Sequence, residues 1–98
     1  MDKTEIQKII FNAIEMVNNT REENEKIAVS IETELYGSNG NLDSMGLVSF
    51  LIDVEESLQD RDIQISLSDD RAMSQLKSPF RNVQTLTDYI DTLIRETN

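Results

Sequence analysis

Hydrophobic residues recur every three or four positions in three stretches of the chain, which is the spacing of one face of an α-helix. The first stretch begins near Thr4, where Gln7 lies at the capping-box distance, and it ends near Asn18. The second follows Asp43 and the third follows Asn82, both favourable helix caps. The apolar positions of the three predicted helices are Ile6, Ile9, Ile10, Ala13, Ile14 and Val17; Leu47, Phe50, Leu51, Val54 and Leu58; and Val83, Leu86, Ile90, Leu93 and Ile94.

The segments between these helices carry weaker patterns. Residues 20–42 read as a long irregular loop, in which Ile27, Ile31 and Leu35 could anchor one or two helical turns. Apolar and polar residues alternate over 63–67 as in a strand, but a single strand has nothing to pair with. We therefore expect an extended linker that inserts its apolar side chains into the core.

A short fourth helix is expected between Ser68, which can cap it, and Pro79, which ends it. Together these elements predict an all-α fold: a small bundle of three main helices plus one short helix, with a long loop between the first and second. The chain has no repeat or linker-like composition, so residues 1–98 are read as a single domain.

The second helix has an apolar surface that folding alone does not require. Asp43 is its expected N-cap, and Leu42 and Leu47 occupy the two positions of a hydrophobic staple. A second apolar stripe, formed by Met45, Val48 and Ile52, runs nearly opposite the core stripe. Polar and acidic residues surround it, which suits a docking surface for a partner. The predicted docking residues are Met45, Val48, Ser49, Ile52, Asp53, Glu55 and Glu56. Two alternatives remain open: a bundle crowded enough to bury both faces, or a homodimer.

The absence of histidine and cysteine excludes whole classes of chemistry. A Ser-His-Asp triad, a Cys-His pair, a disulfide and a typical zinc site cannot be built from this chain. The run from Asn39 to Phe50 offers oxygen ligands but lacks glycine at the sixth position and glutamate at the twelfth, which a calcium loop requires. We therefore expect no metal site and no catalytic activity of the protein's own.

Charge is concentrated in the middle of the chain. The net charge is −10, and no basic residue occurs between Lys26 and Arg61, a stretch that contains seven carboxylates. Such a surface disfavours nucleic acid and favours a partner protein with a basic patch. No apolar run is long enough to span a membrane and the N-terminus does not look like a signal peptide, so a cytoplasmic protein without membrane insertion is expected.

The start of the second helix resembles that of the acyl and peptidyl carrier proteins. In this family a serine that follows an aspartate opens the second helix and carries a phosphopantetheine arm. The matching residues are Leu42-Asp43-Ser44-Met45, then Val48 and Glu55-Glu56 ahead of Leu58, and in the last helix Val83-Gln84 and Asp88-Tyr89-Ile90. Taken in element order, the resemblance extends over nearly the whole chain.

The resemblance implies a function and a site. Ser44 would be the attachment point of 4'-phosphopantetheine, transferred from coenzyme A by a phosphopantetheinyl transferase, and Asp43 would cap the helix and help position that enzyme. The thiol of the arm would carry an acyl or aminoacyl thioester between a loading ligase and downstream transferases or synthases with basic docking patches. The carrier would be a monomer.

Two positions depart from the fatty-acid carriers. Gly46 and Ser49 stand where those proteins often have acidic residues. The form Leu-Asp-Ser-Met-Gly is more similar to the D-alanyl carriers and to stand-alone carriers of specialised pathways. The main alternative function is an unmodified adaptor that docks partner proteins through the acidic second helix.

Overall fold

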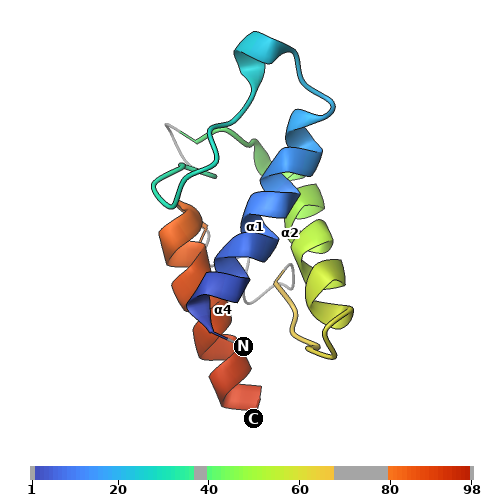
Figure 1. The fold of residues 1–98 in the computed structure, drawn as a ribbon, viewed down its shortest axis with the longest axis vertical. Helices are drawn as coiled ribbons and strands as arrows, with labels where there is room; N and C mark the ends of the chain where they lie inside the picture. The colour runs from blue at the N-terminus through green and yellow to red at the C-terminus, as the bar shows by residue number, and fades with distance from the viewer. Residues whose placement is uncertain (1, 37–39, 68–79, 98) are drawn as a thin grey trace.

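The computed structural model describes residues 2–36, 40–67 and 80–97, and the described residues form an all-α bundle. Its helices are α1 (Lys3–Asn18), α2 (Ser44–Gln59) and α4 (Val83–Thr97), with one 3₁₀ turn, η1 (Glu23–Glu25), between α1 and α2 (Figure 1). These same residues contain no strand, only two isolated β-bridges. The predicted fold class, a small helical bundle with a long loop before the second helix, is confirmed.

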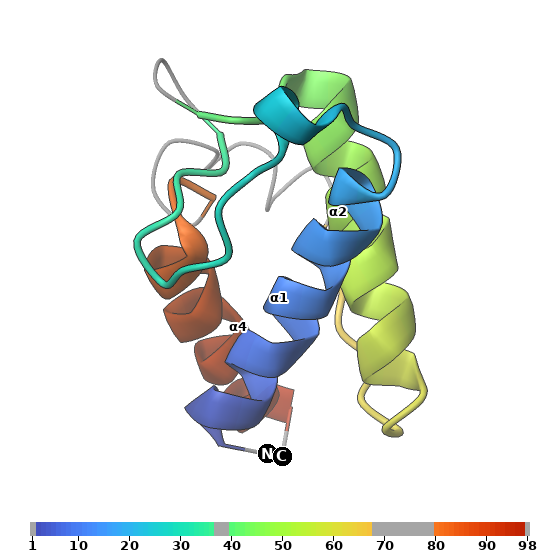
Figure 2. The same ribbon diagram turned by 45° about the horizontal axis from the view of Figure 1, so that its top comes forward.

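Helix α1 occupies the centre of the bundle. It packs against both α2 and α4 and runs antiparallel to each of them (Figures 1 and 2). The predicted apolar stripes meet in one core, where only Val17 and Leu93 are partly rather than fully buried. No helix within the described residues has the length and apolar character needed to cross a membrane.

The predicted caps hold for two helices and fail for one. The Asp43 carboxylate accepts the Gly46 N–H at 2.7 Å, and the Asn82 side chain accepts the Thr85 N–H at 2.8 Å. The assignment of Thr4 as the cap of α1 is wrong, because the Asp2 carboxylate accepts the Glu5 N–H at 2.9 Å. Aspartate is as good an N-cap as threonine or better, and Asp2 lies directly before the first helical residue.

The loop between α1 and α2 is held by hydrogen bonds rather than by helical structure. Ile27 and Leu35 are buried, whereas Val29 and Ile31 are exposed, so Ile31 does not anchor the turn that the sequence allowed. Thr33 and Ile31 offer their carbonyls to the N–H groups of Val83 and Gln84, each at 3.0 Å. The loop thereby supplies acceptors for the first turn of α4, whose N–H groups have no partner within the helix.

The segment after α2 behaves as the predicted linker. Residues 63–67 form no strand; Leu67 is buried, and Ile63 and Ile65 are partly buried against the core. The short helix expected after Ser68 lies outside the described residues.

A left-handed residue ends α2. The N–H of Ile63 donates to the Leu58 carbonyl at 3.0 Å and the N–H of Asp62 donates to the Gln59 carbonyl at 2.9 Å, which is the Schellman pattern. Asp62 has φ 64°, a conformation that glycine adopts without steric cost.

Replacing Asp62 with glycine should therefore raise the free energy of unfolding, by up to about 1 kcal/mol. Asp60→Gly is the matched control, since it removes the same charge from a residue with an ordinary helical φ of −62°. There glycine should destabilise by roughly 0.5–1 kcal/mol. Urea denaturation measures both, and two variants that shift stability in the same direction would contradict the role of Asp62 in the turn.

Candidate functional site

The N-terminal end of α2 is the place where the predicted site residues meet. Asp43 is extended, with φ −85° and ψ −176°, and its carboxylate caps the helix through Gly46 while its carbonyl accepts the Leu47 N–H at 2.8 Å. Ser44 is the first residue of the helix. Leu42 and Leu47, the expected staple, are both buried and fix the direction in which the chain enters the helix.

The backbone just before Ser44 is fastened from two sides. The side-chain amide of Asn41 donates to the Glu34 carbonyl at 2.7 Å, and the backbone N–H of Leu42 donates to the Leu35 carbonyl at 2.9 Å. From the other side, the Arg21 guanidinium donates to the Asn41 carbonyl at 3.1 Å. The backbone leading to residue 44 is thus held by hydrogen bonds to residues of the preceding loop and to Arg21, twenty positions before Asn41.

Gly46 leaves room for the Asp43 carboxylate that caps the helix. A Cβ atom at position 46 would lie 3.1 Å from the Asp43 carboxylate oxygen and 3.5 Å from a methyl carbon of Leu42. The first distance is tighter than an ordinary contact, so a side chain would press on the capping group. Glycine at position 46 therefore lets the Asp43 carboxylate approach the backbone of the helix closely.

The second apolar stripe of α2 divides into exposed and half-buried positions. Met45 is 81% exposed and Ile52 is 42% exposed, as expected of a docking surface. Val48 is half-buried, so only part of the stripe faces solvent. The alternative in which the bundle buries both faces of α2 does not hold for Met45 and Ile52.

The polar residues around the stripe also differ in exposure. Ser49 and Glu56 are exposed, whereas Asp53 and Glu55 are half-buried. The Glu55 carboxylate accepts a hydrogen bond from the N–H of Leu67, so a partner would have to compete for it. Docking by Glu55 stays a prediction.

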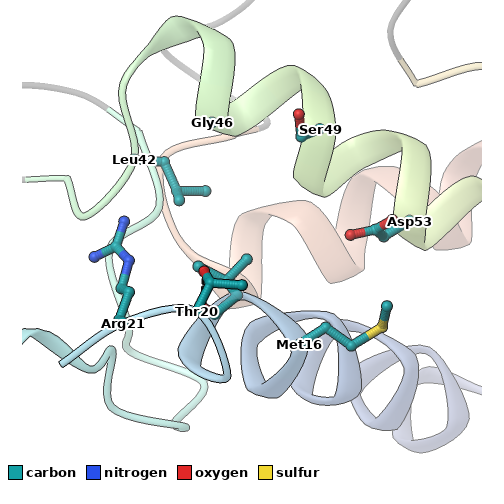
Figure 3. A pocket seen from close by; sticks show the side chains of 8 residues that line it. Met16, Thr20, Arg21, Leu42, Gly46, Ser49 and Asp53 are labelled. Atoms are coloured by element: carbon teal, nitrogen blue, oxygen red, sulfur yellow. Dashed lines mark hydrogen bonds between the residues drawn. The ribbon is translucent and has the colours of Figure 1, made fainter. Parts of the chain in front are cut away.

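A groove runs between the C-terminal end of α1 and the first half of α2 (Figure 3). It has a volume of about 370 Å³. Its lining residues are Met16, Val17, Thr20, Arg21, Leu42, Gly46, Ser49 and Asp53. Two predicted docking residues, Ser49 and Asp53, therefore line a concave surface rather than a flat helix face.

Sequence reasoning missed the part that α1 plays in this surface. Met16 is 55% exposed and points into the space between the helices in Figure 3. Met16 is an apolar residue outside the core stripe of α1. Met45 and Ile52 are predicted to be exposed because they lie outside the core stripe of α2 in the same way. The role of Arg21 had no signal in the sequence, because its acceptors are backbone carbonyls.

The chain has no histidine, so no side chain of the site is a catalytic base of that type. No group of three or more carboxylates that could hold a metal ion occurs among residues 2–36, 40–67 and 80–97. The chain gave no match to any family model, curated protein or solved structure with which it was compared.

Proposed function

We propose that this protein is a carrier protein whose Ser44 is modified with 4'-phosphopantetheine. The observation that carries the proposal is the start of α2, where Asp43 caps the helix and Ser44 is its first residue. The resemblance of this segment to the acyl and peptidyl carriers supplies the chemistry. The phosphopantetheine arm would also provide the thiol group that a chain without cysteine lacks.

The position of residue 44 suits a phosphate ester. The first turn of a helix carries the positive end of the helix dipole and N–H groups without helical acceptors, both of which stabilise an anion. In the transfer, the Ser44 hydroxyl oxygen forms a bond to the phosphorus nearest the pantetheine of coenzyme A. The pyrophosphate bond breaks, 3',5'-ADP leaves, and the hydroxyl proton passes to a base of the transferase.

In this proposal the protein is a substrate of other enzymes rather than an enzyme. It acts as a monomer in the cytoplasm, where coenzyme A is available. A ligase loads an acyl or aminoacyl group on the thiol as a thioester, and downstream transferases or synthases consume it. These partners would approach α2 with basic patches, because every charged residue between Lys26 and Arg61 is acidic.

One observation is equally consistent with the alternative of an unmodified adaptor. The exposed side chains of Met45 and Ile52 provide an apolar contact whether or not residue 44 carries an arm. The adaptor differs from the carrier only in the state of Ser44, so the mass of the protein distinguishes the two.

We expect the purified protein, incubated with coenzyme A, magnesium and a broad-specificity phosphopantetheinyl transferase, to gain one phosphopantetheine group by intact-mass spectrometry. Ser44→Ala should abolish the gain completely, because no other residue starts this helix. Ser66→Ala, at an exposed serine outside α2, is the matched control and should be modified like the wild type. An unmodified wild-type protein, in a reaction that loads a known carrier, would support the adaptor; modification of Ser44→Ala would contradict the site.

A further inference from the structure

The groove between α1 and α2 combines apolar walls with one acidic side chain. Met16 and Val17 come from the end of α1, Leu42 precedes α2, and Asp53 lies further along α2 (Figure 3). The groove is open to solvent on the side where Met16 is 55% exposed. An apolar side chain from a partner could enter here and be shielded from water by both helices.

The exposed stripe of α2 continues this groove. Residues three and four positions apart are neighbours on a helix surface, so Ser49 in the groove wall adjoins Met45, Ile52 and Asp53. Exposed apolar residues therefore flank the groove on both sides, with Met16 on α1 and Met45 and Ile52 on α2. Single exposed apolar residues are ordinary, but a group of them beside a groove marks an interaction surface.

Charge indicates what the groove can accept. The Asp53 carboxylate is half-buried and makes no hydrogen bond or ion pair with another residue in the described part of the chain. Glu56 is exposed one helical turn further on. The cationic group in the lining, Arg21, is at the other end of the groove, where it donates to the carbonyls of Glu25 and Asn41. A cation beside Asp53 would therefore meet an acidic surface.

We propose that this groove is the docking site for a basic amphipathic helix of a partner protein. Such a helix would place an apolar side chain against Met16 and Val17 and a lysine or arginine beside Asp53. The groove between two antiparallel helices accommodates the side-chain ridge of a third, and apolar anchors at helical spacing are the usual mode of helix-in-groove recognition. A second copy of this chain fits poorly, because it would bring another net charge of −10 to the same surface.

Docking in the groove does not require modification of Ser44, so this proposal and the carrier proposal fail separately. The test uses the full unmodified chain, ¹⁵N-labelled, and a synthetic helical peptide of about 16 residues with leucines at positions i, i+3, i+4 and i+7 and lysines elsewhere. The first control peptide has the same composition in an order that breaks the apolar stripe. The second has glutamate in place of lysine.

At near-physiological salt we expect the stripe peptide to bind saturably and to shift the amide signals of the groove residues, with both control peptides binding at least about tenfold more weakly. Met16→Ser and Asp53→Asn should each weaken binding by about five- to tenfold. Val29→Ser and Glu32→Gln change an exposed apolar residue and an exposed acid in the loop, away from the groove, and should leave the dissociation constant within about twofold.

Three results would each overturn the proposal. They are the absence of saturable binding, signal shifts centred on the loop around Val29 instead of on the groove, and an equal loss of affinity in Glu32→Gln and Asp53→Asn. The last result would mean that the peptide responds to the net charge of the protein and not to this surface.

Discussion

Replacing Val54 with serine should lower the free energy of unfolding by about 2–4 kcal/mol, whereas Ile52→Ser should change it by no more than about 0.5 kcal/mol. Val54 is fully buried in the core and Ile52 is 42% exposed, although the two residues lie only two positions apart on the same helix. The core substitution removes apolar contacts and also buries a hydroxyl, while the substitution at Ile52 removes fewer contacts and leaves its hydroxyl accessible to water.

The comparison is closely matched. Both residues are β-branched and aliphatic, both are replaced by serine, and both lie inside α2, so the change in helix propensity nearly cancels between them. Urea denaturation gives the two free energies. If Ile52→Ser unfolds the protein as readily as Val54→Ser, the second stripe belongs to the core and the exposed docking surface is wrong.

The same pair separates stability from interaction. If the carrier proposal holds, folded Ile52→Ser should be modified by the transferase more slowly than the wild type, because apolar residues at the centre of a docking patch contribute much of its binding energy. The rate should be measured at a temperature where the variant is fully folded. An unchanged rate would place Ile52 outside the surface that the transferase contacts.

Asn18→Ala should destabilise the protein by about 2 kcal/mol, because the Asn18 amide makes two hydrogen bonds to one residue of the long loop. Its nitrogen donates to the Ile27 carbonyl at 2.9 Å, and its oxygen accepts the Ile27 N–H at 2.7 Å. Alanine would leave both backbone groups without this partner in a partly buried place, beside the buried Ile27 side chain. Alanine also favours the helix slightly, so the loss is attributable to the loop contact.

Asn19→Ala is the control for this variant. Asn19 is the next residue, is exposed, and lies just beyond the end of α1, so its replacement should change stability by at most about 0.5 kcal/mol. Hydrogen exchange gives a second readout, since the Ile27 amide should lose protection in Asn18→Ala and keep it in Asn19→Ala. Equal stability of the two variants would contradict the role of the Asn18 amide in holding the loop.

The helices of the fold can be predicted from local residue spacing. The core stripes of the three helices, the caps Asp43 and Asn82 and the staple of Leu42 with Leu47 all depend on residues at most five positions apart. Such patterns can be read directly, because helical geometry alone decides which of these residues are neighbours. The same local reading failed at Thr4, since Asp2 is an equally suitable cap nearby.

The candidate site was determined from sequence only in part. Asp43 and Ser44 at the start of α2, and the exposure of Met45 and Ile52, follow from the pattern of that helix. Periodicity shows that α2 has a second apolar face, but it does not show which distant segments cover parts of that face. The Leu67 N–H, twelve residues along the chain, donates to the Glu55 carboxylate, and Val48 is half-buried rather than exposed.

The course of the loop and the existence of the groove depend on contacts between distant segments and cannot be predicted from residue spacing. Asn18 and Ile27 are nine residues apart, and Arg21 and Asn41 are twenty apart, and each pair is joined through a backbone group that every residue possesses. Because nearly every residue has these backbone groups, the amino-acid type of the partner does not reveal such a contact. The groove likewise depends on the packing of α1 against α2, which places Met16 beside Ser49 and Asp53, and no periodicity within a single helix specifies that arrangement.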